Sequence, residues 1–322
     1  MKNIQIIATG SYLPQNKVDN EQLAKELKTT EEFIYKRTGI KTRYYSENET
    51  VEQLAIKSVD DLIKKASSIN INNIDMIIVS TTSTNLLMPG ISYKVQEHFN
   101  IENCMCLDIL AGCAGYINAM DIARNYIAIG KVNKALVIGV DILSEYTDKS
   151  DISTAIVLSD GAGATIIQKT KNEKIYESNI KSEGQKGNLL VNKSNEKIKM
   201  DGKEIYKYAV KETVKNIEDL LENSNTDISE IKYIIPHQSN IKIMNSIVNR
   251  LNIDSKKIYI NIEKVGNTFC SSIPIAIDEM FEKELLQKGD KIILLGYGGG
   301  LNTGSILLEV WYENSIFISR AR

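Results

Sequence analysis

Cys113 is the residue of this chain whose surroundings best suit a nucleophile. It lies in the small-residue stretch 110–116, between a strand-like segment at 104–109 and a segment with helical spacing at 117–129. Small residues let the backbone turn sharply, and the N-terminus of a helix stabilises a negative charge. We therefore expect Cys113 to have a lowered pKa and to act as a nucleophilic thiolate. The alternative is a buried structural cysteine, which is how we interpret Cys104 and Cys106.

Two polar turns in the second half of the chain could assist such a nucleophile. His237 follows the apolar segment 231–235, and α/β proteins bind ligands at the carboxyl ends of their strands. Asn267 lies in a glycine turn near the position that Cys113 holds in the first half. Ordinary loop roles remain the alternative for both residues. The glycines at 298–300 match no phosphate-binding motif, and their free N–H groups better suit an oxyanion hole.

Composition excludes several classes of protein. The chain has 322 residues, of which 43% are hydrophobic and 25% charged, enough for about two domains or one duplicated domain. A net charge of −2 gives no sign of nucleic-acid or membrane-surface binding. No apolar run approaches the ~20 residues of a membrane span, and no signal peptide is recognised. Four cysteines and two histidines predict neither a disulfide scaffold nor a metal site, so we expect a cytoplasmic protein.

Apolar patterns predict alternating helices and strands that occur twice. Segment 74–78 resembles 231–235, and 134–139 resembles 291–296, each pair 157 residues apart. Each half reads strand, helix, strand, helix, strand, which favours parallel strands joined by helical crossovers. We therefore predict an α/β fold with an N-terminal half at 1–170, which carries the cysteine, and a C-terminal half at 171–322, which carries the histidine and asparagine.

Six short motifs identify a family when they are taken together. In chain order they are Arg37-Thr38-Gly39-Ile40, Gly112-Cys113-Ala114-Gly115, Asp160-Gly161-Ala162-Gly163-Ala164, Pro236-His237-Gln238-Ser239-Asn240, Gly266-Asn267-Thr268 and Gly298-Gly299-Gly300. From residue 1 to about 312 the chain resembles β-ketoacyl-acyl-carrier-protein synthase III. The resemblance implies a thiolase-like fold, in which duplicated βαβαβ halves form α-β-α-β-α layers. It also implies decarboxylative condensation of a short acyl-CoA with malonyl-acyl-carrier protein, which initiates fatty acid synthesis. Coenzyme A and phosphopantetheine enter as parts of substrates, and no cofactor is expected.

The resemblance implies roles for particular residues. Cys113, His237 and Asn267 would form the catalytic triad, and the backbone N–H groups of Cys113 and Gly299 the oxyanion hole. His237 would act as a neutral Nε2–H donor. Elongating synthases use two histidines beside the cysteine, and His98 lies in a helix before the nucleophile. Thiolases use a second cysteine, for which Cys270 is available but lies beyond the Gly-Asn-Thr motif.

Other implied contacts concern the substrates and the partner proteins. The implied substrate-binding residues are Arg37, Thr38, Phe33, Met88, Asn240 and Ile152. Phe33 and Ile152 replace a tryptophan and an arginine that usually hold adenine, and Met88 replaces a pocket phenylalanine that the partner subunit supplies. We therefore expect short acyl donors and a weak dependence on the nucleotide.

The carrier protein is expected to bind at Lys207, Lys242 and Arg250. Four further positive charges are expected near the pocket mouth, at Lys36, Arg37, Lys41 and Arg43. A homodimer would pair along the strand at 104–109.

Two further departures from the family pattern leave alternatives open. Phe269 replaces a residue that is small in the family, and residues 313–322 run past the family's usual end. A related ketosynthase or acyltransferase of secondary metabolism, using an unusual or carrier-bound acyl donor, is the main alternative function. A non-catalytic scaffold on the same fold is the other, and the intact triad argues against it.

Overall fold

The computed structural model describes residues 3–84, 88–171, 174–193 and 196–311, and the C-terminal extension at 313–322 lies outside this range. Its first sheet has the strand order β1-β7-β6-β4-β5. β4 pairs in parallel with β5 and β6, whereas β7 pairs antiparallel with β1 and β6. The strands are β1 (Asn3–Tyr12), β4 (Met76–Ser80), β5 (Met105–Ile109), β6 (Lys134–Asp141) and β7 (Gly161–Thr170).

The second sheet repeats this arrangement with strands from 176–309. Its order is β11-β12-β13-β8, with β11 parallel to β12 and the other pairs antiparallel. In place of an equivalent to β5, Ile258 makes a single parallel bridge to Ile234. The strands are β8 (Tyr176–Ser182), β11 (Ile231–Pro236), β12 (Lys291–Gly298) and β13 (Asn302–Glu309). Because β6 and β12 begin 157 residues apart and have equivalent neighbours, the duplication predicted from the sequence is confirmed. The expectation of parallel strands holds only for β4, β5, β6, β11 and β12, because the remaining strands of the two sheets pair antiparallel.

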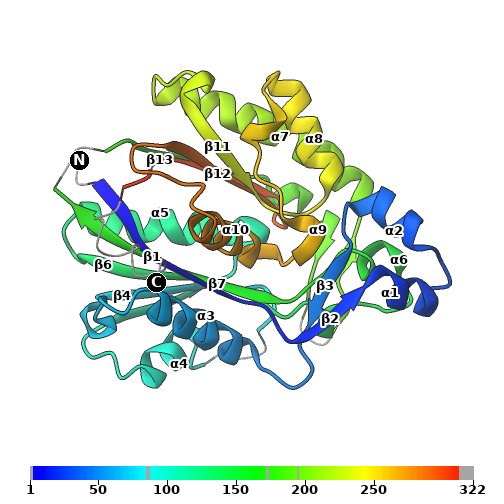
Figure 1. The fold of residues 1–322 in the computed structure, drawn as a ribbon, viewed down its shortest axis with the longest axis horizontal. Coiled ribbons are helices and arrows are strands. Elements are labelled where there is room, and N and C mark those ends of the chain that lie inside the picture. Colours follow the sequence, from blue (N-terminus) through cyan, green and yellow to red (C-terminus); the bar gives the residue numbers. More distant parts are fainter. Residues whose placement is uncertain (1–2, 85–87, 172–173, 194–195, 312–322) are drawn as a thin grey trace.

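Helices form three layers around the two sheets (Figure 1). The middle layer contains α5 (Gly115–Ala128) and α10 (Ser272–Glu282). Most residues of α10 are buried, as is expected of a helix covered by sheets on both sides. The outer layers are α3 (Val51–Lys65) with α4 (Ile91–His98), and α7 (Gly202–Asn223) with α8 (Ile241–Leu251). The predicted α-β-α-β-α layering is therefore present.

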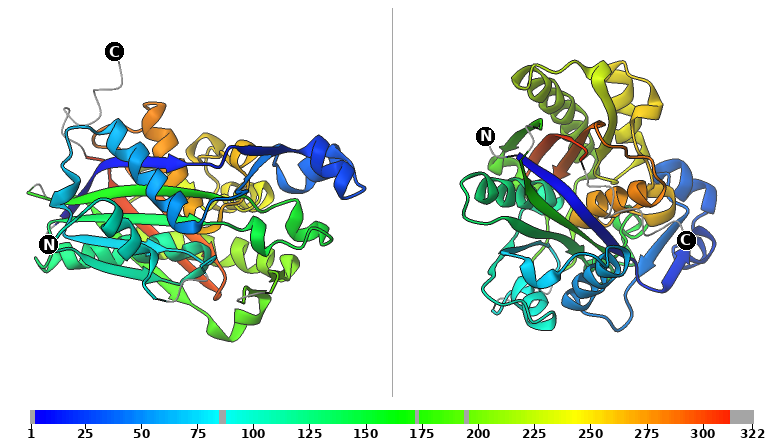
Figure 2. Two further views of the ribbon diagram at one scale, coloured as in Figure 1. Left: turned by 90° about the horizontal axis from the view of Figure 1, so that it is seen from below. Right: turned by 60° about the vertical axis from the view of Figure 1, so that its left-hand side comes forward.

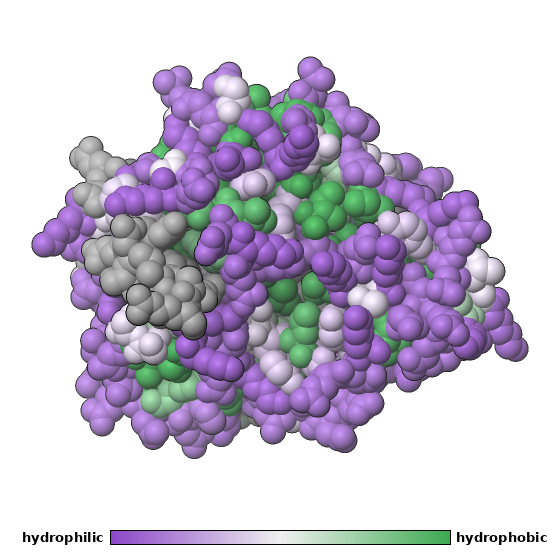
Figure 3. Space-filling view, viewed as in Figure 1, coloured by the Kyte–Doolittle hydropathy of each residue, from purple (hydrophilic) through white to green (hydrophobic). Residues whose placement is uncertain are grey.

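Short elements extend the structure at one end of the sheets. Figure 2 shows the first of them, in blue, projecting beyond the layers in its left-hand view. Here β2 pairs antiparallel with β3. The remaining described elements are short 3₁₀ turns and the two-residue strands β9 and β10. The elements are β2 (Asn16–Asp19), α1 (Asn20–Glu26), α2 (Glu31–Thr38), β3 (Thr42–Tyr45), α6 (Ile152–Ala155), β9 (Leu190–Val191), β10 (Lys199–Met200) and α9 (Ile262–Val265). The face in Figure 3 is mainly hydrophilic, and none of the described helices combines the length and apolarity of a membrane span.

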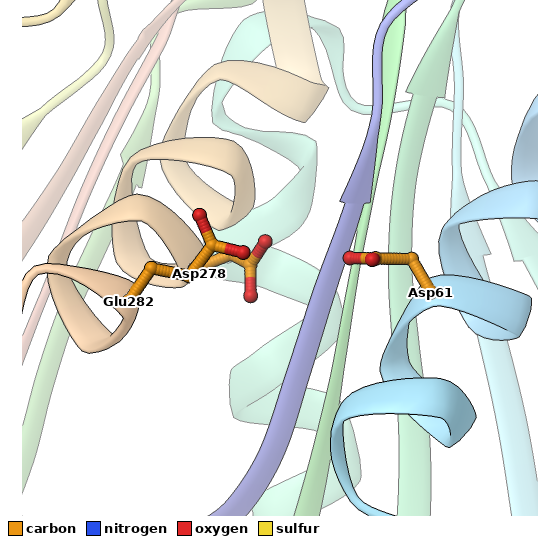
Figure 4. Close-up of side chains that lie close together, drawn as sticks. All are labelled: Asp61, Asp278 and Glu282. Carbon is orange, nitrogen blue, oxygen red and sulfur yellow. The ribbon is translucent and has the colours of Figure 1, made fainter. Parts of the chain in front are cut away.

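Three carboxylates of α3 and α10 lie together across β1 (Figure 4). The Lys65 ammonium lies 2.5 Å from Asp61, 2.6 Å from Asp278 and 2.5 Å from Glu282. Asp278 is buried and also accepts a 2.8 Å hydrogen bond from the Thr9 hydroxyl. Buried carboxylates are stable when they are paired and hydrogen-bonded in this way. The cluster is therefore a network of ion pairs that links α3 to α10, and Lys65 supplies its positive charge.

Candidate active site

The predicted nucleophile lies on a tight turn between β5 and α5. Residues Gly112–Ala114 form a single 3₁₀ turn, and Gly112 has φ = +57°, a conformation that glycine adopts without strain. A Cβ atom on Gly112 would lie 2.4 Å from the carbonyl oxygen of Gly299. A Cβ on Gly298 would lie 2.7 Å from Cys113 Sγ. Glycines on both sides therefore let the cysteine turn meet the end of β12.

Burial dominates the chemistry of the Cys113 thiol. The residue is 3% exposed, and burial raises the pKa of its thiol to about 12. The backbone N–H groups of Gly299 and Cys113 hydrogen-bond the sulfur and oppose this effect. The lowered pKa expected from the helix N-terminus is therefore wrong for the resting site, because loss of water outweighs the helix. The same two N–H groups are those expected to form the oxyanion hole.

His237 stands at the end of β11 as a buried, neutral donor. Burial lowers the pKa of its imidazole to about 3, so it is uncharged at neutral pH. Its Nδ1 lies 2.7 Å from the Ser272 hydroxyl, which accepts a 3.3 Å hydrogen bond from the Gln238 N–H. Ser272 can therefore donate its own proton to Nδ1, which leaves the ring proton on Nε2. This assignment matches the neutral Nε2–H donor expected from the sequence.

Asn267 is fixed by its backbone and by its side chain. Its carbonyl accepts from Ser159 N–H at 2.9 Å, and its N–H donates to the Val157 carbonyl at 3.1 Å. The Phe269 N–H donates to Asn267 Oδ1 at 3.0 Å. With Oδ1 engaged there, the Nδ2 group carries the donors that remain for a ligand.

One pocket brings the three residues together from three separate turns. Cys113, His237 and Asn267 all line it, as do Gly298 and Tyr297 from β12. Its other lining residues are Arg37, Thr38, Ser153, Ile156, Val157, Leu190, Met200, Gly202, Ile205, Tyr206, Ser239, Asn240, Ile243 and Phe269. The pocket therefore pairs a cysteine with two hydrogen-bond donors, the set needed to acylate sulfur and stabilise an enolate.

The expected substrate contacts divide into two groups. Arg37, Thr38 and Asn240 line the pocket, and Asn240 Nδ2 donates to the Arg37 carbonyl at 3.1 Å. Phe33 lies on the exposed face of α2, with the Arg37 guanidinium 5.8 Å from the centre of its ring. At α6 the neighbouring Ser153, rather than Ile152, lines the pocket.

Met88 is 87% exposed in the single chain and lies outside this pocket.

The three residues expected to bind the carrier protein are exposed on neighbouring helices. Lys207 lies on α7, and Lys242 and Arg250 lie on α8. Lys207 also pairs with Glu204 at 2.6 Å, so the carboxylate offsets its positive charge at this point of the surface. Together they form a basic surface on the outer layer.

The positive charges expected at the pocket mouth are partly absent from the surface. Arg43 is fully buried, where its guanidinium donates to Asn20 at 2.8 Å and to the Ile156 carbonyl at 3.3 Å. Lys41 is exposed but pairs with Glu263 at 2.9 Å. The interpretation of Arg43 as a surface charge is therefore wrong, because its side chain points from β3 into the interior, against Asn20 and the Ile156 carbonyl.

The sequence did not single out Ser272 or Tyr297, although both contact His237. The Tyr297 hydroxyl lies 2.7 Å from the Ser239 hydroxyl and donates to the His237 carbonyl at 3.2 Å. The rings of His237 and Tyr297 meet edge to face at 5.3 Å. The sequence signal that could have indicated Tyr297 was its position near the end of an apolar strand, since His237 also lies where an apolar strand ends.

The remaining cysteines and histidine do not join this site. Cys270 is buried, with Sγ 2.8 Å from Asp141 Oδ2, and it is not among the pocket's lining residues. The two-cysteine arrangement of thiolases is therefore not formed here. Cys104 and Cys106 are half-buried at the edge strand β5, rather than buried as expected. His98 is exposed on α4, as expected.

Comparisons with known proteins identify the family. Family models of 3-oxoacyl-[acyl-carrier-protein (ACP)] synthase III match residues 107–184, and 221–310 for the C-terminal part. A curated β-ketoacyl-[acyl-carrier-protein] synthase III of Clostridium botulinum (strain Okra / Type B1) is 41% identical over 323 residues, which covers 96% of this chain and 99% of the relative.

Solved structures give the same result. The 3-oxoacyl-[acyl-carrier-protein] synthase III of Aquifex aeolicus VF5 is 35% identical with a TM-score of 0.92, covering 95% of this chain and all of that one. The Thermus thermophilus synthase III has a TM-score of 0.91 and 28% identity, over 95% of this chain and 99% of that one. The thiolase-like fold is thus confirmed, and the chain belongs to the β-ketoacyl-acyl-carrier-protein synthase III family.

Proposed function

We propose that this chain condenses a short acyl-CoA with malonyl-acyl-carrier protein, with loss of carbon dioxide, to give a 3-ketoacyl-acyl-carrier protein. The observation that carries the proposal is the convergence of Cys113, His237 and Asn267 in one pocket. Membership of the synthase III family supports the same reaction as the initiating step of fatty acid synthesis. Such a reaction belongs in the cytoplasm, where carrier protein and acyl-CoA meet.

In the first half-reaction, the Cys113 sulfur attacks the carbonyl carbon of the acyl thioester. The N–H groups of Cys113 and Gly299 hold the oxyanion of the tetrahedral intermediate. Collapse breaks the bond to the coenzyme A sulfur, which leaves with the proton from Cys113. Because the pKa of the resting thiol is about 12, the thiolate has to form as substrate binds and attack begins. The acyl group then remains on Cys113.

In the second half-reaction, the malonyl thioester loses its carboxylate as carbon dioxide. The bonding electrons pass into an enolate, whose oxygen accepts hydrogen bonds from His237 Nε2–H and Asn267 Nδ2–H. The enolate carbon forms a bond to the acyl carbon, and the bond to the Cys113 sulfur breaks. The Cys113 sulfur, released as a thiolate, takes up a proton from solvent, and the 3-ketoacyl thioester leaves. No metal or redox cofactor takes part in this scheme.

The proposed residues can be separated by half-reaction. Incubation with acetyl-CoA followed by digestion and mass measurement should place the acetyl group on Cys113. Asn267→Ala and His237→Ala should slow decarboxylation of malonyl-carrier protein by ~10²–10³, the usual effect of one lost donor. Acetyl transfer to Cys113 should fall less. Labelling of Cys270 instead, or loss of acylation with intact decarboxylation, would overturn these roles.

The basic surface on α7 and α8 is the proposed dock for the acidic carrier protein. Lys207, Lys242 and Arg250 are exposed there, and complementary charge accelerates encounter. Replacing Lys242 or Arg250 with Glu should raise KM for malonyl-carrier protein and leave acetyl-CoA loading unchanged. An equal loss with malonyl-CoA as the second substrate would contradict carrier docking.

We also propose a homodimer that pairs along β5. This strand is at the edge of its sheet, and all five of its residues are half-buried. Such an edge can pair with a strand of a second chain. Leu110 next to it is 73% exposed, and Met88 is 87% exposed. In a two-fold dimer these apolar side chains would be covered by the second copy. Light scattering should give about twice the 36.1 kDa chain mass, and a stable monomer at micromolar concentration would contradict it.

The secondary-metabolism alternative is favoured only by the weak nucleotide contacts. Phe33 has its own partner in Arg37, and Ile152 offers no charge near the pocket mouth. Acyl-coenzyme A and the matching acyl-pantetheine should therefore load Cys113 with similar kcat/KM. A preference above ~10³ for the full coenzyme would mean that adenine is held by other residues. A strong preference for acyl-carrier protein would instead favour the alternative.

A further inference from the structure

Phe269 has a backbone conformation that bulky residues rarely adopt. Its φ is +47°, in the left-handed region. The pseudo-equivalent residue 157 positions earlier is Gly112, with φ = +57°. Both residues begin a 3₁₀ turn that leads into a middle-layer helix, Gly112 before α5 and Phe269 before α10. One half of the duplicated fold thus uses glycine at this position, and the other holds an aromatic ring there against the backbone preference.

The Phe269 side chain belongs to the enclosed, apolar part of the active-site pocket. It is 4% exposed and lines the pocket together with Cys113. The 3₁₀ turn that Phe269 begins is in contact with the turn that carries Cys113. The pocket residues Arg37 and Tyr206, by contrast, are exposed and mark the mouth. Phe269 therefore lies at the buried end of the pocket, beside the turn whose sulfur would carry the acyl group.

The contact between Phe269 and Asn267 does not explain the aromatic ring. Asn267 Oδ1 accepts from the backbone N–H of residue 269, a group that every residue except proline supplies. A glycine would make that contact with no penalty from the positive φ. The aromatic ring is therefore better explained by the space in the pocket that it occupies.

From this placement we propose that Phe269 is a specificity-determining residue that limits the acyl group on Cys113 to short chains. The inference rests on the proposed function, because it concerns the acyl group that the function places on the sulfur. The pantetheine arm occupies the route from the mouth to Cys113, so the acyl chain has to extend into the remaining apolar space. A buried phenyl ring removes that space for a longer chain, and each methylene that fails to fit lowers kcat/KM by 10- to 200-fold.

The test compares loading of Cys113 by acyl-CoAs of increasing length in the wild type, Phe269→Ala and Phe269→Leu. Intact-protein mass gives the initial rates for acetyl-, butyryl-, hexanoyl- and octanoyl-CoA. The wild type should load acetyl and butyryl groups and load hexanoyl at least tenfold more slowly. In Phe269→Ala the hexanoyl-to-acetyl ratio of kcat/KM should rise at least tenfold. Phe269→Leu, which keeps apolar bulk, should raise the ratio by a smaller factor.

Phe281→Ala is the matched control. Phe281 is also a buried phenylalanine, but it lies on α10 and does not line the pocket. Its replacement should leave the hexanoyl-to-acetyl ratio within twofold of the wild type. A wild type that loads no acyl group on Cys113 would refute the proposed function. Normal acetyl loading with unchanged ratios in both Phe269 variants, or an equal change in Phe281→Ala, would refute the role of Phe269 alone.

Discussion

Removing the Ser272 hydroxyl should impair the enolate step by releasing His237. The hydroxyl lies 2.7 Å from Nδ1 and accepts from the Gln238 N–H at 3.3 Å, so its proton points toward the ring. Both partners are buried, and an unsatisfied buried acceptor costs about 1–3 kcal/mol. In Ser272→Ala this preference for the Nε2–H tautomer is lost. Because 1.36 kcal/mol corresponds to a tenfold change in rate, decarboxylation should fall about 5- to 150-fold.

The assay separates this effect from general destabilisation. Release of carbon dioxide from malonyl-carrier protein measures the enolate step, and intact-protein mass measures acetyl loading of Cys113. Ser271→Ala is the matched control, because Ser271 is also buried and its hydroxyl donates to the Thr268 carbonyl at 2.9 Å. Both variants should lose similar stability, while only Ser272→Ala loses decarboxylation. A Ser272→Ala rate within twofold of the wild type would refute the assignment of the His237 tautomer.

Two further predictions concern the same histidine. In Tyr297→Phe the hydrogen bonds of the tyrosine hydroxyl with Ser239 and with the His237 carbonyl are lost. The free energy of unfolding, measured by chemical denaturation, should fall by about 1 kcal/mol, and carbon dioxide release should slow several-fold. An unchanged free energy of unfolding would contradict this prediction. Because burial lowers the pKa of His237 to about 3, its contribution to stability is complete above pH 6.5, the ordinary value, and is lost as pH falls from 6.5 toward 3. The decarboxylation rate should accordingly stay flat from pH 7.5 to about 5 while the protein is folded, and a half-loss near pH 6.5 would show an ordinary, solvated histidine.

The sequence predicted the main parts of the site because local rules determine them. Cys113 and His237 each follow an apolar strand, one in each sheet, and α/β folds place ligand-binding residues at the carboxyl ends of their strands. The 157-residue repeat placed Asn267 in the corresponding turn of the other half, and the pocket brings all three together. No knowledge of side-chain packing was needed for this.

What the sequence could not predict depends on contacts between distant segments. Arg43 is one of several positive charges close together in the sequence, yet it is buried against the Ile156 carbonyl, 113 residues away. Ser272 and Tyr297 reach His237 across 35 and 60 residues. The predicted direction of the Cys113 pKa shift is wrong, because the sequence shows the helix N-terminus but not the burial that removes water from the thiol.

The duplicated turn shows why the surroundings, and not the fold position, make a nucleophile. Cys270 lies 157 residues after Cys113, in the turn that begins α10 as the Cys113 turn begins α5. Burial raises the pKa of both thiols. Around Cys113 the sulfur meets backbone N–H groups, which favour a thiolate and later an oxyanion. Around Cys270 the Asp141 carboxylate lies 2.8 Å from the sulfur and opposes a negative charge there, which outweighs the hydrogen bonds from Ser80 and Val140 that favour it. The carboxylate in direct contact with Cys270, and its absence from direct contact with Cys113, thus favour the first turn for the chemistry.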